Sequence, residues 1–166
     1  MIRFAFLDKR EKVQYAQRLF NLLYANMSVI APTGYTYQED FAAWSAAVLP
    51  ALDKPQRQIV CIYDDEAFIG YFQYYVNDDL FMMEEIQFLR SYQSEKQLFR
   101  RLYTFLLPQL PAGICFVEAY ANKKNIKSQE ILKHLGLSVT KENETNLHYR
   151  GNYMDLVNWC TKEKIN

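Results

Sequence analysis

The chain has 166 residues, of which 50% are hydrophobic and 16% aromatic. It is therefore long enough to bury a core and too apolar to be disordered throughout. The basic and acidic residues balance, 19 against 19, which argues against a dedicated nucleic-acid-binding protein because such proteins carry a large basic excess. We expect one domain over residues 1–166, and the low net charge allows a homodimer.

The cysteines and histidines offer no recognisable metal site. Cys61, Cys115 and Cys160 stand far apart, and His134 and His148 are the only histidines, so no zinc signature is present. We expect no metal, and reduced thiols in a cytoplasmic protein. The N-terminal segment is too short and too charged for a signal peptide, and no apolar stretch approaches the ~20 residues of a membrane span, so we expect no membrane association.

Apolar spacing and capping signals predict the elements of the first part of the chain. They are a strand over residues 2–7, a helix opened by a capping box at Asp8–Glu11 and broken at Pro32–Gly34, and a helix opened by a second capping box at Thr36–Glu39 and ended near Pro50.

The middle of the chain has the pattern of a β-meander. Strand-like runs over residues 58–63, 67–76 and 80–89 are separated by short acidic turns, which predicts antiparallel pairing. Helical spacing returns from Leu98 to Leu106, and residues 114–120 form a buried-strand pattern. Because a helix joins this strand to the preceding one, we expect the two strands to pair in parallel.

The last part of the chain completes the predicted sheet. A helix over residues 126–135 ends at Gly136, a residue suited to a left-handed cap. Strand candidates follow at residues 137–140 and 147–159. The order β, α, α, β, β, β, α, β, α, β, β predicts an α+β protein with a mixed sheet of about seven strands, mostly antiparallel with one parallel β-α-β pair, and about four helices.

This element order resembles the GNAT (Gcn5-related N-acetyltransferase) fold over nearly the whole chain. Asn125 and Ser128, followed by Leu132 and Gly136–Leu137, resemble the family's Asn-x-x-Ala, Tyr and Gly-Phe spacing, and residues 150–156 look like its last strand. The resemblance implies that acetyl-CoA is the co-substrate. It also implies that the acceptor is a primary amine of a small molecule or peptide.

The family's coenzyme A pyrophosphate motif, Gln/Arg-x-x-Gly-x-Gly/Ala, aligns with Gln93 onward, but Lys96 and Leu98 occupy the glycine positions. Such glycines let backbone N–H groups approach a pyrophosphate at a helix N-terminus, so a side chain there can block the site. Lys96 can instead pair with the pyrophosphate, or be an ordinary solvated cation. The cofactor-binding positions implied by the resemblance are Phe88, Leu89, Arg90, Gln93, Ser94, Glu95, Lys96, Gln97, Leu98, Asn125 and Ser128.

Acetyl transfer needs a base that takes a proton from the amine. Glu84 and Glu85 lie on the strand that resembles the family's fourth and point to opposite faces, so at most one faces the cleft. Of the two we favour Glu85 as the base; the alternative is a solvated or edge-paired carboxylate. Glu118 interrupts an apolar run, so it either serves the acceptor cleft or pairs with a nearby Lys or Arg. The family's thiolate-protonating tyrosine aligns with Leu132, which cannot donate a proton; the conceivable replacements are Tyr92, Tyr120 and Tyr149.

Two functions stay open. The first is a cytoplasmic N-acetyltransferase, for which the resemblance also implies an acceptor cleft with aromatic residues. The candidates are Tyr35, Tyr37, Phe41, Trp44, Tyr149 and Tyr153, and the alternative is that most of these rings belong to the core or its rim. The second is a non-catalytic binding or regulatory module on the same fold, which the departures at Lys96, Leu98 and Leu132 favour.

Overall fold

A computed structural model describes residues 1–162, without the side chain of Lys96. Its strands form a 7-stranded sheet in the hydrogen-bonded order β1-β2-β3-β4-β5-β7-β6. The strands are β1 (Ile2–Phe6), β2 (Arg57–Asp64), β3 (Ala67–Asn77), β4 (Leu80–Phe88), β5 (Phe116–Asn122), β6 (Ser138–Glu142) and β7 (Asn146–Asn152). The helices are α1 (Lys12–Ile30), α2 (Tyr37–Ala51), α3 (Lys96–Leu106), α4 (Ile126–His134) and α5 (Tyr153–Thr161). This mixed α+β sheet is the predicted fold class.

The chain divides into two compact units. The first comprises residues 1–75 and 85–93, and the second comprises residues 76–84 and those from Ser94 onward. The expectation of a single domain stays a prediction.

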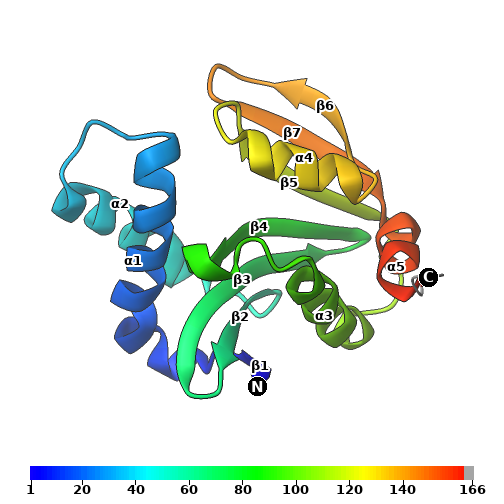
Figure 1. The fold of residues 1–166 in the computed structure, drawn as a ribbon, viewed down its shortest axis with the longest axis horizontal. Helices are drawn as coiled ribbons and strands as arrows, with labels where there is room; N and C mark the ends of the chain where they lie inside the picture. The colour runs from blue at the N-terminus through cyan, green and yellow to red at the C-terminus, as the bar shows by residue number, and fades with distance from the viewer. Residues whose placement is uncertain (163–166) are drawn as a thin grey trace. The chain divides into compact units, whose positions relative to one another are not determined.

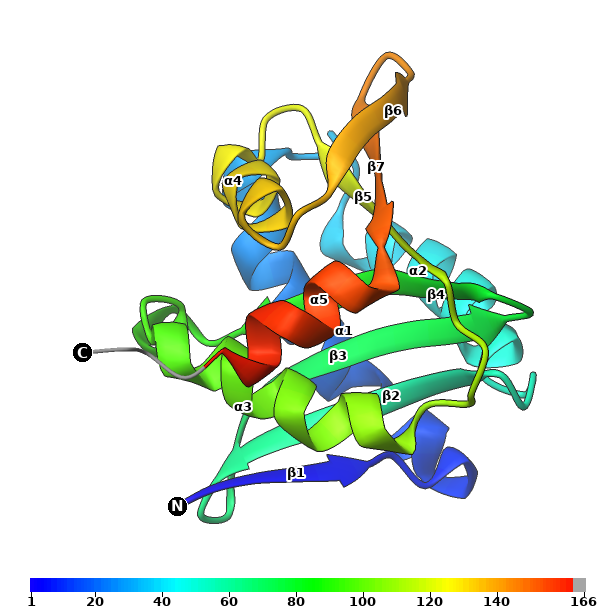
Figure 2. The same cartoon turned by 90° about the vertical axis from the view of Figure 1, so that its right-hand side faces the viewer.

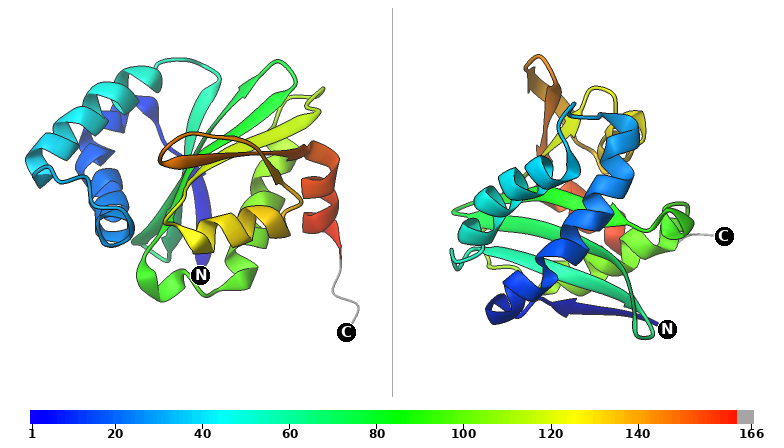
Figure 3. Two further views of the ribbon diagram at one scale, coloured as in Figure 1. Left: turned by 90° about the horizontal axis from the view of Figure 1, so that it is seen from above. Right: turned by 90° about the vertical axis from the view of Figure 1, so that its left-hand side faces the viewer.

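The first unit is an antiparallel sheet covered on one face by α1 and α2. β1 pairs with β2, and β2 pairs with β3; the two helices cross the β2–β3 surface (Figure 3, right). The core between these helices and the sheet consists of Leu7, Leu19, Leu22, Leu52, Ile59, Cys61, Tyr63 and Tyr71. The predicted capping box of α2 is confirmed, since Thr36 and Glu39 bond each other's backbone N–H reciprocally.

The second unit contains the predicted parallel pair. Residues Leu80–Met83 of β4 pair in parallel with Phe116–Ala119 of β5, and β7 lies antiparallel between β5 and β6. Helix α4 packs along β5 (Figure 1). It ends as predicted, because Gly136 has φ +93° and the N–H groups of Gly136 and Leu137 bond the carbonyls of Lys133 and Leu132.

Two local predictions are wrong. Asp8 caps a short 3₁₀ turn over Lys9–Glu11 by accepting from the Arg10 N–H, so α1 begins only at Lys12. Residues 153–159 continue no strand but form α5, which buries Leu156 and packs beside α3 (Figure 2). Residues 1–162 therefore form five α-helices, where about four were expected.

Within residues 1–162, no helix is both long enough and apolar enough to cross a membrane.

Candidate functional site

Glu85 lies on the face of β4 that meets α1. Glu85 and Gln87 are two residues apart on the strand, so their side chains point to the same face. The Gln87 Nε2–H donates to Glu85 Oε1 at 2.7 Å. The buried Tyr71 belongs to the same core as Leu19 and Leu22 of α1. Burial, and secondarily the charge of Glu85, raises the pKa of Tyr71 well above its usual value. Among residues 1–162, its hydroxyl has no hydrogen-bond partner. The first unit thus holds a half-buried carboxylate beside a buried phenol.

A chain of amide side chains leads from Glu85 to the residues that follow β4. The Asn26 Nδ2–H donates to Gln87 Oε1 at 2.8 Å and to the Phe88 carbonyl at 2.9 Å. The Gln93 Nε2–H donates to Asn26 Oδ1 and to the same carbonyl, each at 3.1 Å. Gln93 therefore fastens the turn after β4 to α1.

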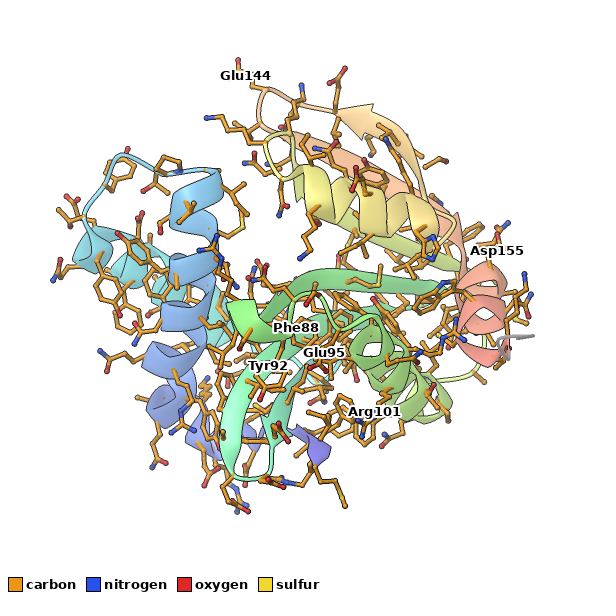
Figure 4. The ribbon with its side chains drawn as sticks, in the orientation of Figure 1. Phe88, Tyr92, Glu95, Arg101, Glu144 and Asp155 are labelled. Atoms are coloured by element: carbon orange, nitrogen blue, oxygen red, sulfur yellow. The ribbon has the colours of Figure 1, made fainter. Side chains whose placement is uncertain are left out.

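The segment after β4 is held by further contacts of the first unit. The Leu89 N–H bonds the Ile69 carbonyl at 2.8 Å, and the Tyr92 hydroxyl donates to Asp64 at 2.9 Å. Phe88 and Tyr92 are both labelled in Figure 4. Gly70 is required beside this segment, because a Cβ there would lie 2.6 Å from the Gln87 carbonyl oxygen and 2.7 Å from the Phe88 ring.

Helix α3 begins two residues after Ser94. Ser94, Glu95 and Gln97 are exposed, and the first N–H groups of such a helix lack intrahelical acceptors, which favours an anion there. Leu98, at a family glycine position, is only 2% exposed and belongs to the core. The side chain of Lys96 lies outside the described part of the chain, so its pairing with a pyrophosphate stays a prediction.

Asn125 and Ser128 form the N-terminal cap of α4. Asn125 Oδ1 accepts from the Ser128 N–H at 3.2 Å, which caps α4. The buried Gln129 secures the preceding turn by donating to the carbonyls of Asn122 and Lys123. Leu132, where the family has a tyrosine, is buried.

Glu118 is the buried centre of an ionic cluster in the second unit. Its Oε1 accepts from Arg150 Nη1 at 3.0 Å, and its Oε2 lies 3.2 Å from His148 Nε2. Tyr120 stacks on the His148 ring at 4.6 Å, and Arg150 lies 4.0 Å over the Phe116 ring. Of the two readings of Glu118, the structure bears out the pairing with a cation.

The three tyrosines considered as replacements for Leu132 differ in environment. Tyr92 donates its hydroxyl to Asp64, and Tyr120 is 55% exposed over His148. Tyr149 is fully buried, which raises its pKa, and its hydroxyl has no partner among residues 1–162.

The aromatic residues of α1 and α2 pack chiefly on one another. Phe20 contacts four rings at centroid distances of 5.2–5.8 Å, those of Tyr24, Tyr37, Phe41 and Trp44. All four are partly exposed, so the cluster both joins the helices and presents ring surface to solvent. The role of these rings in acceptor binding stays a prediction, and Tyr149, another candidate for the lining, is fully buried.

Sequence reasoning did not find Asn26 and Gln87. No sequence pattern around either residue predicts their contact; the available signal was the polar Gln87 within an apolar strand pattern. In residues 1–162, no three His, Cys, Asp or Glu side chains are grouped so that they could hold a metal ion.

No protein-family model and no curated protein matches this chain. Solved structures do match it. The PaiA N-acetyltransferase from Thermoplasma acidophilum, in complex with coenzyme A, has 11% identity and a TM-score of 0.68, covering 92% of this chain and 99% of that one. A GNAT-family acetyltransferase from Desulfovibrio desulfuricans has 14% identity and a TM-score of 0.65, covering 92% and 99%. A spermidine N-acetyltransferase from Vibrio cholerae has 11% identity and a TM-score of 0.60, covering 95% and 97%. The chain thus has the GNAT fold.

Proposed function

We propose that this protein is a cytoplasmic N-acetyltransferase that transfers an acetyl group from acetyl-CoA to a primary amine of a small molecule or peptide. The observation that carries the proposal is the GNAT fold, which spans 92% of the chain in the match to an acetyltransferase bound to coenzyme A.

Glu85 is the proposed base. The amine nitrogen attacks the thioester carbonyl carbon, the carbon–sulfur bond breaks, and the sulfur keeps the bonding electrons as the coenzyme A thiolate. The amine must lose a proton for this step, and Glu85 takes it. Its Oε1 is already oriented by the Gln87 donor, and the cluster around Phe20 in the same unit offers aromatic surface to an apolar or cationic amine. Glu118 is not assigned this role, because Arg150 donates to its Oε1 and the His148 ring lies 3.2 Å from its Oε2.

The coenzyme A site is proposed at the segment that follows β4. The exposed residues at the start of α3, with the backbone N–H groups of its first turn, suit the pyrophosphate; Lys96 adds a cation there. Leu98 takes no direct part, because it is buried. No general acid is assigned, since Leu132 cannot donate a proton and an alkyl thiolate of pKa ~8.5 leaves without one.

A second candidate function is a binding module without catalysis. The observation that favours it is that Leu98 and Leu132, at positions where the family places ligand-facing residues, are both core residues here. Such a module would lack acetyl transfer to any amine.

The test is an acetylation assay with acetyl-CoA and a panel of primary amines, polyamines and N-terminal peptides, read by mass spectrometry of the acetylated product. We expect turnover with at least one amine and a loss of about 10²–10⁴-fold in kcat for Glu85→Gln. The matched control is Glu144→Gln at the exposed tip of the β6–β7 hairpin (Figure 4), which should retain activity. Absence of product with every amine, while acetyl-CoA still binds, would favour the binding module.

A further inference from the structure

The amide side chains beside Glu85 form a directional chain of hydrogen bonds. Gln93 donates to Asn26 at 3.1 Å, Asn26 donates to Gln87 at 2.8 Å, and Gln87 donates to Glu85 at 2.7 Å. Asn26 and Gln87 each accept at the amide oxygen and donate at the amide nitrogen, and Gln93 donates at the start of the chain, so all three bonds point from the turn after β4 toward the carboxylate. We call Gln93, Asn26, Gln87 and the carboxylate of Glu85 the amide relay.

The direction of the relay gives it physical consequences. Amides aligned head to tail polarise one another and strengthen the chain cooperatively. The last bond ends on a carboxylate, and a charge-assisted hydrogen bond of this kind is roughly twice as strong as a neutral one. Gln87 is only 7% exposed, so breaking its bonds would leave buried polar groups unpaired.

The end of the relay formed by Asn26 and Gln93 also holds the turn that follows β4. Asn26 and Gln93 both donate to the Phe88 carbonyl, at 2.9 and 3.1 Å. The backbone at the end of β4 and the carboxylate of Glu85 therefore share one set of hydrogen bonds. A change at either end alters the bonds available to the other.

We infer that Asn26 and Gln87 are positioning residues that couple coenzyme A binding to the ionised state of Glu85. The inference rests on the proposed function, since it takes Glu85 as the base and the segment after β4 as the coenzyme site. Loss of the negative charge on Glu85 removes the charge-assisted bond and loosens the anchor of Gln93, which weakens coenzyme A binding. By linkage, bound coenzyme A favours the ionised Glu85 that can accept the amine proton.

The test is calorimetric titration of coenzyme A alone, without any amine, into four proteins: the native chain, Glu85→Gln, Asn26→Leu and the double variant. We expect Glu85→Gln to raise the Kd about 3-fold to 10-fold in the native background, a size usual for residues of one network. In the Asn26→Leu background, where the relay is broken, the same change should alter the Kd less than about 2-fold. Glu144→Gln, which removes one charge away from the relay, should leave the Kd unchanged in both backgrounds.

The outcomes separate the relay from the proposed function. An equal effect of Glu85→Gln in both backgrounds, or no effect in either, overturns the relay and leaves acetyl-CoA binding standing. A native chain that does not bind coenzyme A overturns the proposed function and the relay together. Should Asn26→Leu fail to fold, Gln87→Met replaces it, because an unbranched apolar side chain of similar length fits the buried site and removes both of its amide bonds.

Discussion

Glu118 shows how a charged residue inside an apolar strand is stabilised. The β5–β7 register sets Glu118 opposite Arg150 and Tyr120 opposite His148, so the cation Arg150 comes from the neighbouring strand. Sequence reasoning predicted that a buried carboxylate needs a cation. It could not name the partner, because the pairing joins residues 32 positions apart and depends on the strand register.

Arg150→Met should destabilise the protein by about 1.5–3 kcal/mol, because it leaves the buried Glu118 carboxylate without its hydrogen-bonded cation. Adding Glu118→Gln to this variant should recover part of the loss, since the unpaired charge is then removed. Urea unfolding of both variants measures the difference. A double variant that is less stable than Arg150→Met would contradict the pairing.

Burial raises the pKa of the Cys61 thiol to about 11. An unfolded thiol has a pKa of ~8.5, so the unfolded chain releases its proton first as the pH rises. The contribution of the neutral thiol to the free energy of unfolding is fully present below about pH 8.5. It is lost progressively as the pH rises toward 11.

The free energy of unfolding of the native chain should therefore fall, relative to that of Cys61→Ala, by on the order of 2 kcal/mol between pH 7.5 and pH 10. Urea unfolding at both pH values measures this change. The control is Cys115→Ala, which alters an exposed thiol. A difference between native chain and Cys61→Ala that stays constant with pH would show that the thiol is not protected by burial.

At the scale of elements, β3 and the end of β4 approach each other closely at one glycine. Gly70→Ala places a methyl group 2.6 Å from the Gln87 carbonyl oxygen, and backbone atoms cannot move away without disturbing the sheet. We expect a loss of about 1–3 kcal/mol in stability. Thermal unfolding gives the value; a melting temperature equal to that of the native chain would mean that the strands do not approach as described.

Elements with strong local signals were predicted well from sequence. The α2 capping box and the α4 glycine cap depend on residues within one or two turns, and both are confirmed. Helix α5 was missed because the chain passes directly from β7 through Asn152 into the helix, without a loop between the two elements. Its apolar residues Tyr153, Leu156 and Trp159 recur every third residue, a spacing that indicates a helix rather than the predicted strand.

At the scale of the whole molecule, the parallel β4–β5 pair followed from the rule that a helix joins parallel neighbours. The position of β7 between β5 and β6 did not follow from local patterns, since it sets the last strand beside one formed earlier in the chain. The same limit applies to the amide relay: Asn26 and Gln87 meet across 61 residues of sequence, and neither residue type signals a partner by itself.

The central claim is that a chain of GNAT fold without the motif glycines still binds acetyl-CoA. Calorimetric titration of acetyl-CoA into the native chain tests it most directly, because it needs no knowledge of the acceptor amine. The account predicts saturable binding at one site per chain, with a Kd within the range of about 1 μM–1 mM usual for enzyme substrates. Titration to several millimolar without a binding isotherm would contradict it and leave a fold that serves some other ligand.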